Sequence, residues 1–248
     1  MVCNGGLSSA LCAAILYYDA GPQTPECAAQ RGALLLVLLA TLACCCADTW
    51  ASELGMLAQS SPILITSGQT VPPGTNGGVT WQGTGAALAG GAAMGLVAAT
   101  GGEMARRLQG HSVCAVQAAA RKSLQFWWRV LGRAVTAGMQ SYSGHGFGMS
   151  WKFRHFGHAL RSRWEVAAVL VGFGMLCGVA GCMLDSLLGA LFQFSGWDNE
   201  RKRVVSAPGR GVKHIAGRHW LDNNAVNLVA AAATASGAVA AFALPAFS

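Results

Sequence analysis

Residues 48–55 read DTWASELG, and they directly follow an apolar run, residues 32–47, that contains no charged residue. An apolar run extended by the next few residues is long enough for a membrane-spanning helix of about 20 residues. The carboxylates of Asp48 and Glu53 then fall at or just beyond the end of a span. Ionisable groups at this depth are costly to bury and usually serve a function. The stretch therefore predicts a membrane helix with a functional site at its end.

The composition is that of a membrane protein. The chain has 248 residues, of which 53% are hydrophobic and 11% are charged, whereas soluble domains average about 25% charged. The predicted spans are residues 32–57, 80–100, 166–194 and 224–247. Residues 7–18 are too short to cross and are predicted as one end of a helix or a half-helix, with a loop at residues 19–31. We expect an all-α, polytopic membrane helix bundle that forms one integral-membrane domain over residues 1–248.

The basic residues are unevenly distributed. The net charge is +7, and ten of the 17 Lys and Arg residues lie within residues 101–165, where only two acidic residues occur. Six more lie between Arg201 and Arg218. Because these stretches lie beside apolar spans, a basic membrane face is favoured over nucleic-acid binding. Residues 101–165 are predicted to be a basic insertion between spans, with an interfacial helix at residues 113–139.

Small residues occur at helical spacing in the third long span. The stripe consists of Gly174, Gly178, Gly181, Asp185 and Gly189. Small residues let a neighbouring helix approach closely, and Asp185 is placed in that contact. A lone Asp that faced lipid would cost several kcal/mol, so Asp185 is expected to face protein, water or a metal ion. A Gly-x-x-x-Gly pattern at residues 91–95 predicts a similar close contact for the second span.

Two polar loops lie outside the spans. The first, residues 59–79, contains the Gly-rich sequence PPGTNGGVT at residues 72–80, which suits a phosphate and its metal ion. The second, residues 195–223, carries Lys213, His214 and Arg218, which can balance phosphate charge, and Asp222, which can hold Mg²⁺ or an acceptor group. Counting spans places both loops on one side of the membrane and the insertion on the other.

The two carboxylates of the opening stretch do not share a helix face. Asp48 and Ser52 lie on one face, and Thr49 and Glu53 lie on the adjacent one. The carboxylates are five residues apart, so a single ion held by both requires the helix to end or bend between them. A solvated helix end is the alternative explanation of these charges.

Several stretches together resemble the signatures of a known family. They read DTWASE at residues 48–53, VPPGTNGG at 71–78, DSLLGALFQ at 185–193, KHIAGR at 213–218 and LDNNAVN at 221–227. They are similar to those of the transmembrane protein 19 family, which includes the phytyl-phosphate kinases of plants and cyanobacteria. The resemblance covers residues 2–95 and 165–228. Family members carry further hydrophobic helices before this point, so an N-terminally truncated chain is expected.

The resemblance implies an integral-membrane phosphotransferase. The acceptor would be an isoprenoid monophosphate such as phytyl phosphate, the co-substrate a nucleoside triphosphate and the cofactor Mg²⁺. The implied catalytic residues and metal ligands are Asp48, Glu53, Asp185 and Asp222. The implied substrate- and phosphate-binding residues are Thr49, Ser52, Gly74, Thr75, Asn76, Gly77, Gly78, Ser186, Gln193, Lys213, His214, Arg218, Asn223, Asn224 and Asn227. Ile63 stands where the family usually has Arg, a departure expected to weaken phosphate binding.

A multi-pass transporter or a non-catalytic membrane protein is the alternative function. Carboxylates within spans also mark ion and substrate pathways. The two motif loops differ in sequence, so no inverted repeat supports transport. Either function agrees with a plastid or an endoplasmic-reticulum membrane, and protein partners are not indicated.

Overall fold

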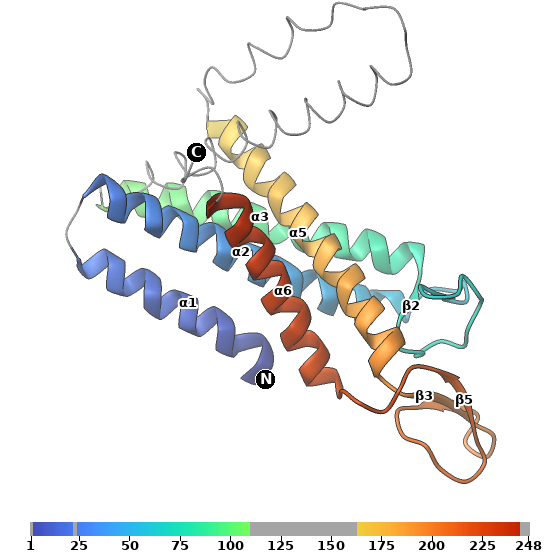
Figure 1. Cartoon of the computed structure of the whole chain (residues 1–248). Helices are drawn as coiled ribbons and strands as arrows, with labels where there is room; N and C mark the ends of the chain where they lie inside the picture. The colour runs from blue at the N-terminus through green and yellow to red at the C-terminus, as the bar shows by residue number, and fades with distance from the viewer. Residues whose placement is uncertain (1, 22–23, 110–162, 244–248) are drawn as a thin grey trace, which may run out of the picture.

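The computed structural model describes residues 2–21, 24–109 and 163–243, and these residues are mostly helical (Figure 1). The helices are α1 (Val2–Ala20), α2 (Pro25–Gly55), α3 (Trp81–Gln109), α5 (Arg163–Phe192) and α6 (Asn223–Ala243). Three of the described segments are long and apolar enough to cross a membrane, namely Gln30–Gly55, Trp81–Gly101 and Trp164–Phe192. The predicted helix bundle is thus confirmed. The span predicted at residues 224–247 stays a prediction, because α6 is described only to Ala243.

The two polar loops contain short strands that the sequence did not indicate. In the first loop, β1 (Ile63–Leu64) pairs antiparallel with β2 (Gly78–Val79). In the second loop, β3 (Ser195–Asp198) is the central strand between β4 (Arg203–Val205) and β5 (Val212–Ala216). Backbone groups need hydrogen-bond partners once a loop packs against the protein, and short ladders provide them.

The connection between the first two helices is shorter than the loop predicted at residues 19–31. The helix α1 continues to Ala20, and α2 already begins at Pro25. Pro is favoured in the first turn of a helix, and the Thr24 side chain accepts a hydrogen bond from the Cys27 backbone N–H at 3.2 Å as the N-cap. An ion pair between Arg31 and Asp19 joins the two helices near this turn. The loop prediction failed because it treated these polar residues as loop rather than as helix ends.

The stripe of small residues on α5 makes the close contacts that its spacing predicted. A Cβ at Gly174 would collide with the backbone carbonyl of Gly91 on α3. A Cβ at Gly178 would lie 2.9 Å from the Cβ of Ala47 on α2, a distance that real side chains do not reach. Backbones can approach this closely only when no side chain intervenes, and dispersion between them then holds the helices together. The core of the bundle therefore depends on glycine at these positions.

Gly174→Ala should lower the free energy of unfolding by about 1–3 kcal/mol, because the new methyl group forces α5 away from α3. Thermal unfolding in lipid nanodiscs measures this loss. Gly172→Ala is the matched control: it lies on the same helix, it is exposed, and its Cβ would meet nothing within 4 Å. Equal unfolding temperatures for the two variants would contradict the packing argument.

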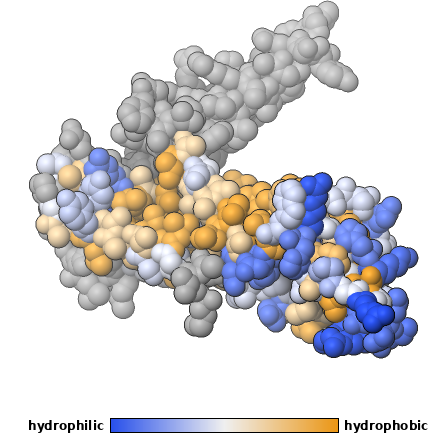
Figure 2. Space-filling model, turned by 60° about the horizontal axis from the view of Figure 1, so that its bottom comes forward, coloured by the Kyte–Doolittle hydropathy of each residue, from blue (hydrophilic) through white to orange (hydrophobic). Residues whose placement is uncertain are grey.

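Both polar loops lie at one end of the bundle, which we call the loop end; it carries residues 56–80 and 193–222 (Figure 1). The backbone N–H of Asn76 donates to Ser195 Oγ at 3.0 Å, which joins the first loop to the second. In Figure 2 the middle of the molecule is apolar and the loop end is hydrophilic. The prediction that both loops lie on one side is confirmed. The helix α3 ends at Gln109 and α5 begins at Arg163, so the interfacial helix predicted at residues 113–139 lies outside the described residues.

Candidate functional site

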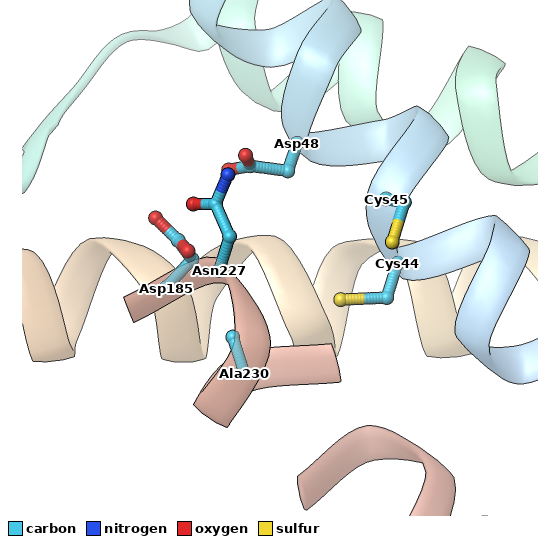
Figure 3. A pocket seen from close by; sticks show the side chains of 6 residues that line it. All are labelled: Cys44, Cys45, Asp48, Asp185, Asn227 and Ala230. Atoms are coloured by element: carbon cyan, nitrogen blue, oxygen red, sulfur yellow. The ribbon is translucent and has the colours of Figure 1, made fainter. Parts of the chain in front are cut away.

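Three polar side chains from three helices meet in one pocket. Asp48 comes from α2, Asp185 from α5 and Asn227 from α6, and their side chains point toward one another (Figure 3). Cys44, Cys45 and Ala230 complete the lining of the pocket. All three polar residues are half-buried. Their convergence brings together residues that are up to 179 positions apart in the chain.

All three polar residues lie close to the loop end. Asp48 is seven residues before the end of α2, Asp185 is seven residues before the end of α5, and Asn227 is four residues after the start of α6. With a helix rise of about 1.5 Å per residue, the pocket is roughly 6–10 Å inside the helix ends. It is therefore within reach of a ligand that enters from the loop end.

Asn227 holds Asp185 in place. In the amide orientation that satisfies its neighbours, Asn227 Nδ2 donates to Asp185 Oδ2 at 2.9 Å and to the backbone carbonyl of Asn223 at 3.1 Å. This bond fixes one carboxylate oxygen of Asp185 and leaves the other for a ligand. Because the amide comes from α6, the orientation of the Asp185 carboxylate depends on how α6 packs against α5.

The pocket is small. Its cavity volume is about 10 Å³, roughly the space that a single water molecule needs, whereas sites for drug-sized ligands occupy about 300–1,000 Å³. It has room for a single ion or for one oxygen atom of a phosphate group. A whole nucleotide would have to extend out of it.

The Gly-rich loop packs closely on the last two turns of α5. A Cβ at Gly77 would collide with the Cβ of Ala190 and would come within 2.6 Å of the backbone carbonyl of Ser186. Gly77 also has a φ of 78°, a conformation in which glycine is favoured. The Asn76 side chain donates to the Phe194 carbonyl at 3.2 Å. Gly77 is thus required both for the turn and for the contact with α5.

Several hydrogen-bond donors of the Gly-rich loop are already bonded to acceptors within the protein. The N–H groups of Thr75, Asn76 and Gly78 donate to Pro72 O, to Ser195 Oγ and to Thr75 O, respectively. The buried Thr75 hydroxyl donates to Pro72 O at 2.7 Å. These bonds fix the shape of the loop. A phosphate that binds here would have to use the remaining donors, such as the N–H of the exposed Gly74.

The second loop caps the C-terminal end of α5. Helices end with carbonyl groups that have no partner within the helix. Arg218 N donates to Leu191 O at 3.1 Å, and the N–H groups of Trp220 and Leu221 donate to Phe192 O at 3.1 and 3.0 Å. The Trp220 ring stacks on Phe192 with a centroid distance of 5.9 Å. The stretch KHIAGR is thereby fixed at the helix end.

The three predicted bases lie on this cap. Lys213 and His214 belong to β5, Arg218 follows it, and all three side chains are exposed. His214 Nε2 lies 2.8 Å from the Gly217 carbonyl, and the Arg218 guanidinium lies 4.9 Å from the centre of the Trp220 ring. The bases are at the same end of the bundle as the pocket, beyond the end of α5 rather than within the pocket lining.

The other predicted residues have different surroundings. The helix α2 stays regular through Gly55, so Asp48 turns inward while Glu53 is exposed. A single ion held by both carboxylates required the helix to end or bend between them, and the helix does neither. The hydroxyls of Thr49 and Ser52 donate to carbonyls of their own helix, at 2.8 and 3.0 Å. Asp222 accepts a hydrogen bond from Ala225 N at 2.8 Å and so caps the start of α6.

Four further predicted residues surround these elements. Asn223 and Asn224 are exposed at the start of α6, and Asn223 supplies the carbonyl that accepts from Asn227. Ser186 is half-buried under the Gly-rich loop. Gln193 is 7% exposed just after α5, and its carbonyl lies against Gly217. None of these four residues lines the pocket.

The sequence analysis missed several residues of the site. Cys44 and Ala230 line the pocket, and Cys44 is four residues before Asp48 while Ala230 is three residues after Asn227. Helical spacing from the predicted residues would have found both. Ser195 is fully buried and binds the Gly-rich loop, but no local pattern identifies it.

Among the described residues, no group of three or more His, Cys, Asp or Glu side chains could hold a metal ion by itself. An ion at the pocket would have Asp48 and Asp185 as charged ligands, and water or a substrate phosphate would complete its coordination. Mg²⁺ is commonly bound in this way, by one or two carboxylates together with substrate phosphates and water. The donor set of the pocket therefore fits Mg²⁺ only as part of a complex with a phosphate ligand.

Comparison with known proteins places the chain in a family. The model of the integral membrane protein DUF92 family matches residues 1–235, so the chain belongs to that family. The protein is similar to Protein PGR of Arabidopsis thaliana, with 31% identity over 233 residues, which is 92% of this chain. The chain spans 63% of the length of that relative. No solved structure matches the chain.

Proposed function

We propose that this membrane protein is a phosphotransferase that uses a nucleoside triphosphate and Mg²⁺ to phosphorylate an isoprenoid monophosphate, as the phytyl-phosphate kinases do. The convergence of Asp48, Asp185 and Asn227 near the loop end is the observation that carries this proposal. The five motif stretches resemble those of the transmembrane protein 19 family, which includes phytyl-phosphate kinases, and this resemblance supports an isoprenoid monophosphate as the substrate. A location in a plastid or endoplasmic-reticulum membrane is part of the same proposal.

Two carboxylates in one pocket suit a metal-assisted phosphoryl transfer. When bound, Mg²⁺ would neutralise part of the charge on the transferred phosphoryl group. Asp48 and Asp185 would hold the ion, and Asn227 would keep Asp185 in its orientation. Because a monophosphate acceptor already carries an ionised oxygen near neutral pH, the protein needs no strong general base.

The capped end of α5 gives the phosphates a basic surrounding. Lys213, His214 and Arg218 would balance the charge of the nucleotide where it extends from the small pocket. The Gly-rich loop, fixed on the last turns of α5, would exclude water from one side of the phosphates. Apolar surfaces of the spans would accommodate the isoprenoid chain in the bilayer. Exposed Glu53 and the N-cap Asp222 stay candidates for a second ion.

Purified protein in lipid nanodiscs tests the proposal directly. Labelled nucleoside triphosphate and phytyl monophosphate should yield phytyl diphosphate, and removal of Mg²⁺ with a chelator should stop the reaction. Binding of Mn²⁺ as a spectroscopic substitute for Mg²⁺ is a second measurement that does not require turnover. Folded protein that neither transfers phosphate nor binds Mn²⁺ at the pocket, but moves ions across vesicles, would establish the alternative of a transporter.

Arg218→Ala should raise the KM for the nucleotide about tenfold with little change in kcat, because it removes a cation that contacts phosphate in both ground and transition states. Steady-state kinetics at varied nucleotide concentration measures the change. Ser206→Ala, at an exposed position of the same loop, is the control for a side-chain truncation there. Unchanged nucleotide kinetics for a folded Arg218→Ala variant would remove Arg218 from the site.

A further inference from the structure

A second group of cations lies on β4 and in the turns on either side of it, in the same sheet as the bases assigned to the phosphates. We define the basic hairpin as residues 198–212, which include β4 and the turns on either side of it. Its cations are Arg201, Lys202, Arg203 and Arg210, and all four are exposed. Its acidic residues are Asp198 and Glu200. The hairpin is therefore a compact positive surface at the loop end.

Four cations and two carboxylates leave the basic hairpin with a formal net charge of +2. Arg201 Nε lies 3.8 Å from Asp198 Oδ2, and the Arg201 side chain is 68% exposed. The described part of the chain offers no ion-pair partner to Lys202, Arg203 or Arg210. Asp198 is occupied within the turn, where the backbone N–H groups of Arg201 and Glu200 donate to it and hold its pKa below the usual value. Positive side chains that are held close together and lack an ion-pair partner in the described part of the chain are suited to bind an external anion.

The hairpin is tethered to the edge of a membrane-spanning helix. The central strand of the sheet, β3, begins three residues after the end of α5, and the cap formed by residues 217–221 binds the last carbonyls of α5. The segment Trp164–Phe192 of α5 is apolar enough to cross a membrane. The hairpin therefore cannot move far from the plane in which that span ends.

Exposed tryptophans indicate that this plane is the headgroup layer. Trp220 on the cap is 66% exposed, and Trp81 at the start of α3 is 86% exposed. Trp164, at the other end of α5, is 84% exposed. Trp is enriched at both interfaces of a bilayer, where its ring lies at the level of the headgroups. The distance along α5 from Trp164 to Phe192, about 42 Å at 1.5 Å per residue, agrees with the thickness of a bilayer including headgroups.

We propose that the basic hairpin binds the headgroups of anionic lipids in the leaflet on the side of the motif loops. Clustered Lys and Arg beside a membrane span attract anionic lipids within about one Debye length of the surface. The contact would hold the three-stranded sheet against the bilayer, and with it Lys213 and His214 on β5 and Arg218 on the cap. This inference concerns a lipid contact and does not depend on the phosphotransferase activity.

Hydrogen exchange of the full chain in nanodiscs tests the lipid contact. In discs of phosphatidylcholine mixed with phosphatidylglycerol, amides of residues 199–211 should exchange at least about fivefold more slowly than in discs of phosphatidylcholine alone. The difference should disappear at high ionic strength, because salt shortens the Debye length to about 3 Å at 1 M. Equal exchange in both lipids at low salt would overturn the proposal.

Two variants identify the residues responsible. Replacement of all four cations by Gln should abolish the effect of phosphatidylglycerol, while Arg201→Lys, Arg203→Lys and Arg210→Lys together should keep it, because the charge is preserved. If the Gln variant fails to fold, the Lys variant and the salt dependence of the unmodified chain still decide the question. Protection that follows the addition of nucleotide or nucleic acid, and not the anionic lipid, would assign the hairpin to those ligands and overturn the lipid proposal.

Discussion

Asp185→Asn and Asp48→Asn should each reduce phosphoryl transfer about 10²–10³-fold or more, because each removes a negative ligand from the proposed ion. The two variants keep the size of the side chain. Asn at position 185 still offers an oxygen to Asn227, so the hydrogen bond between α5 and α6 is retained. The measurement is single-turnover transfer from labelled nucleotide in nanodiscs. Thermal unfolding of the same samples establishes that the variants are folded.

The double variant separates a shared ion from two independent roles. If both carboxylates act through one ion, Asp48→Asn combined with Asp185→Asn should be barely slower than either single variant. If the rate loss of the double variant equals the product of the two single losses, the carboxylates act separately. Glu200→Gln, a charge change at an exposed position of the hairpin, is the control and should leave the rate unchanged. Residual activity per folded molecule together with lower stability would indicate a structural role for the pocket.

Gly217→Ala should detach the second loop from α5 and cause a large loss of both stability and activity. Gly217 has a φ of 73°, and a Cβ there would collide with the backbone carbonyl of Gln193. The atoms that the new Cβ would meet are backbone atoms and cannot turn aside as a flexible side chain can. The cap on α5 therefore has to move as a whole. We expect a loss of about 2–4 kcal/mol in the free energy of unfolding, from backbone strain and overpacking together.

Gly211→Ala is a matched control for this effect. Gly211 lies in the same loop with a φ of 74°, but a Cβ there would meet nothing within 4 Å. Both variants therefore carry the same cost of a left-handed alanine, about 1 kcal/mol. The difference between them measures the contact of the loop with α5. Hydrogen exchange in the last turn of α5 should increase only in Gly217→Ala, and equal exchange in both variants would contradict the capping role.

The outcome for Asp48 and Glu53 shows what periodicity can predict about a site. Helical spacing placed the two carboxylates on different faces, and in the structure Asp48 lines the pocket while Glu53 is exposed. The same spacing predicted the stripe of small residues on α5 that meets α2 and α3. Such predictions succeed because the faces of one helix depend only on its own period of 3.6 residues.

The sequence could not identify the partner of Asp185. Asn227 was predicted only as an amide on a face shared with Asn223, and nothing in its own segment relates it to a carboxylate 42 residues earlier. The sequence likewise did not indicate that Asp222 caps the start of α6, and its assignment to a metal site stays a prediction. The short strands were missed because a strand of two to five residues exists only through its partner strand.

The sequence by itself determined that this is a multi-pass membrane protein, where three of its spans lie, and which glycines lie in close helix contacts. These properties follow from composition and from local period, which do not depend on distant parts of the chain. Only the tertiary structure decided that Asp48, Asp185 and Asn227 form one pocket, and that the two polar loops join through Asn76 and Ser195 at the end of α5. Such contacts depend on how α2, α5 and α6 cross, and the crossing is set by the packing of all their faces at once.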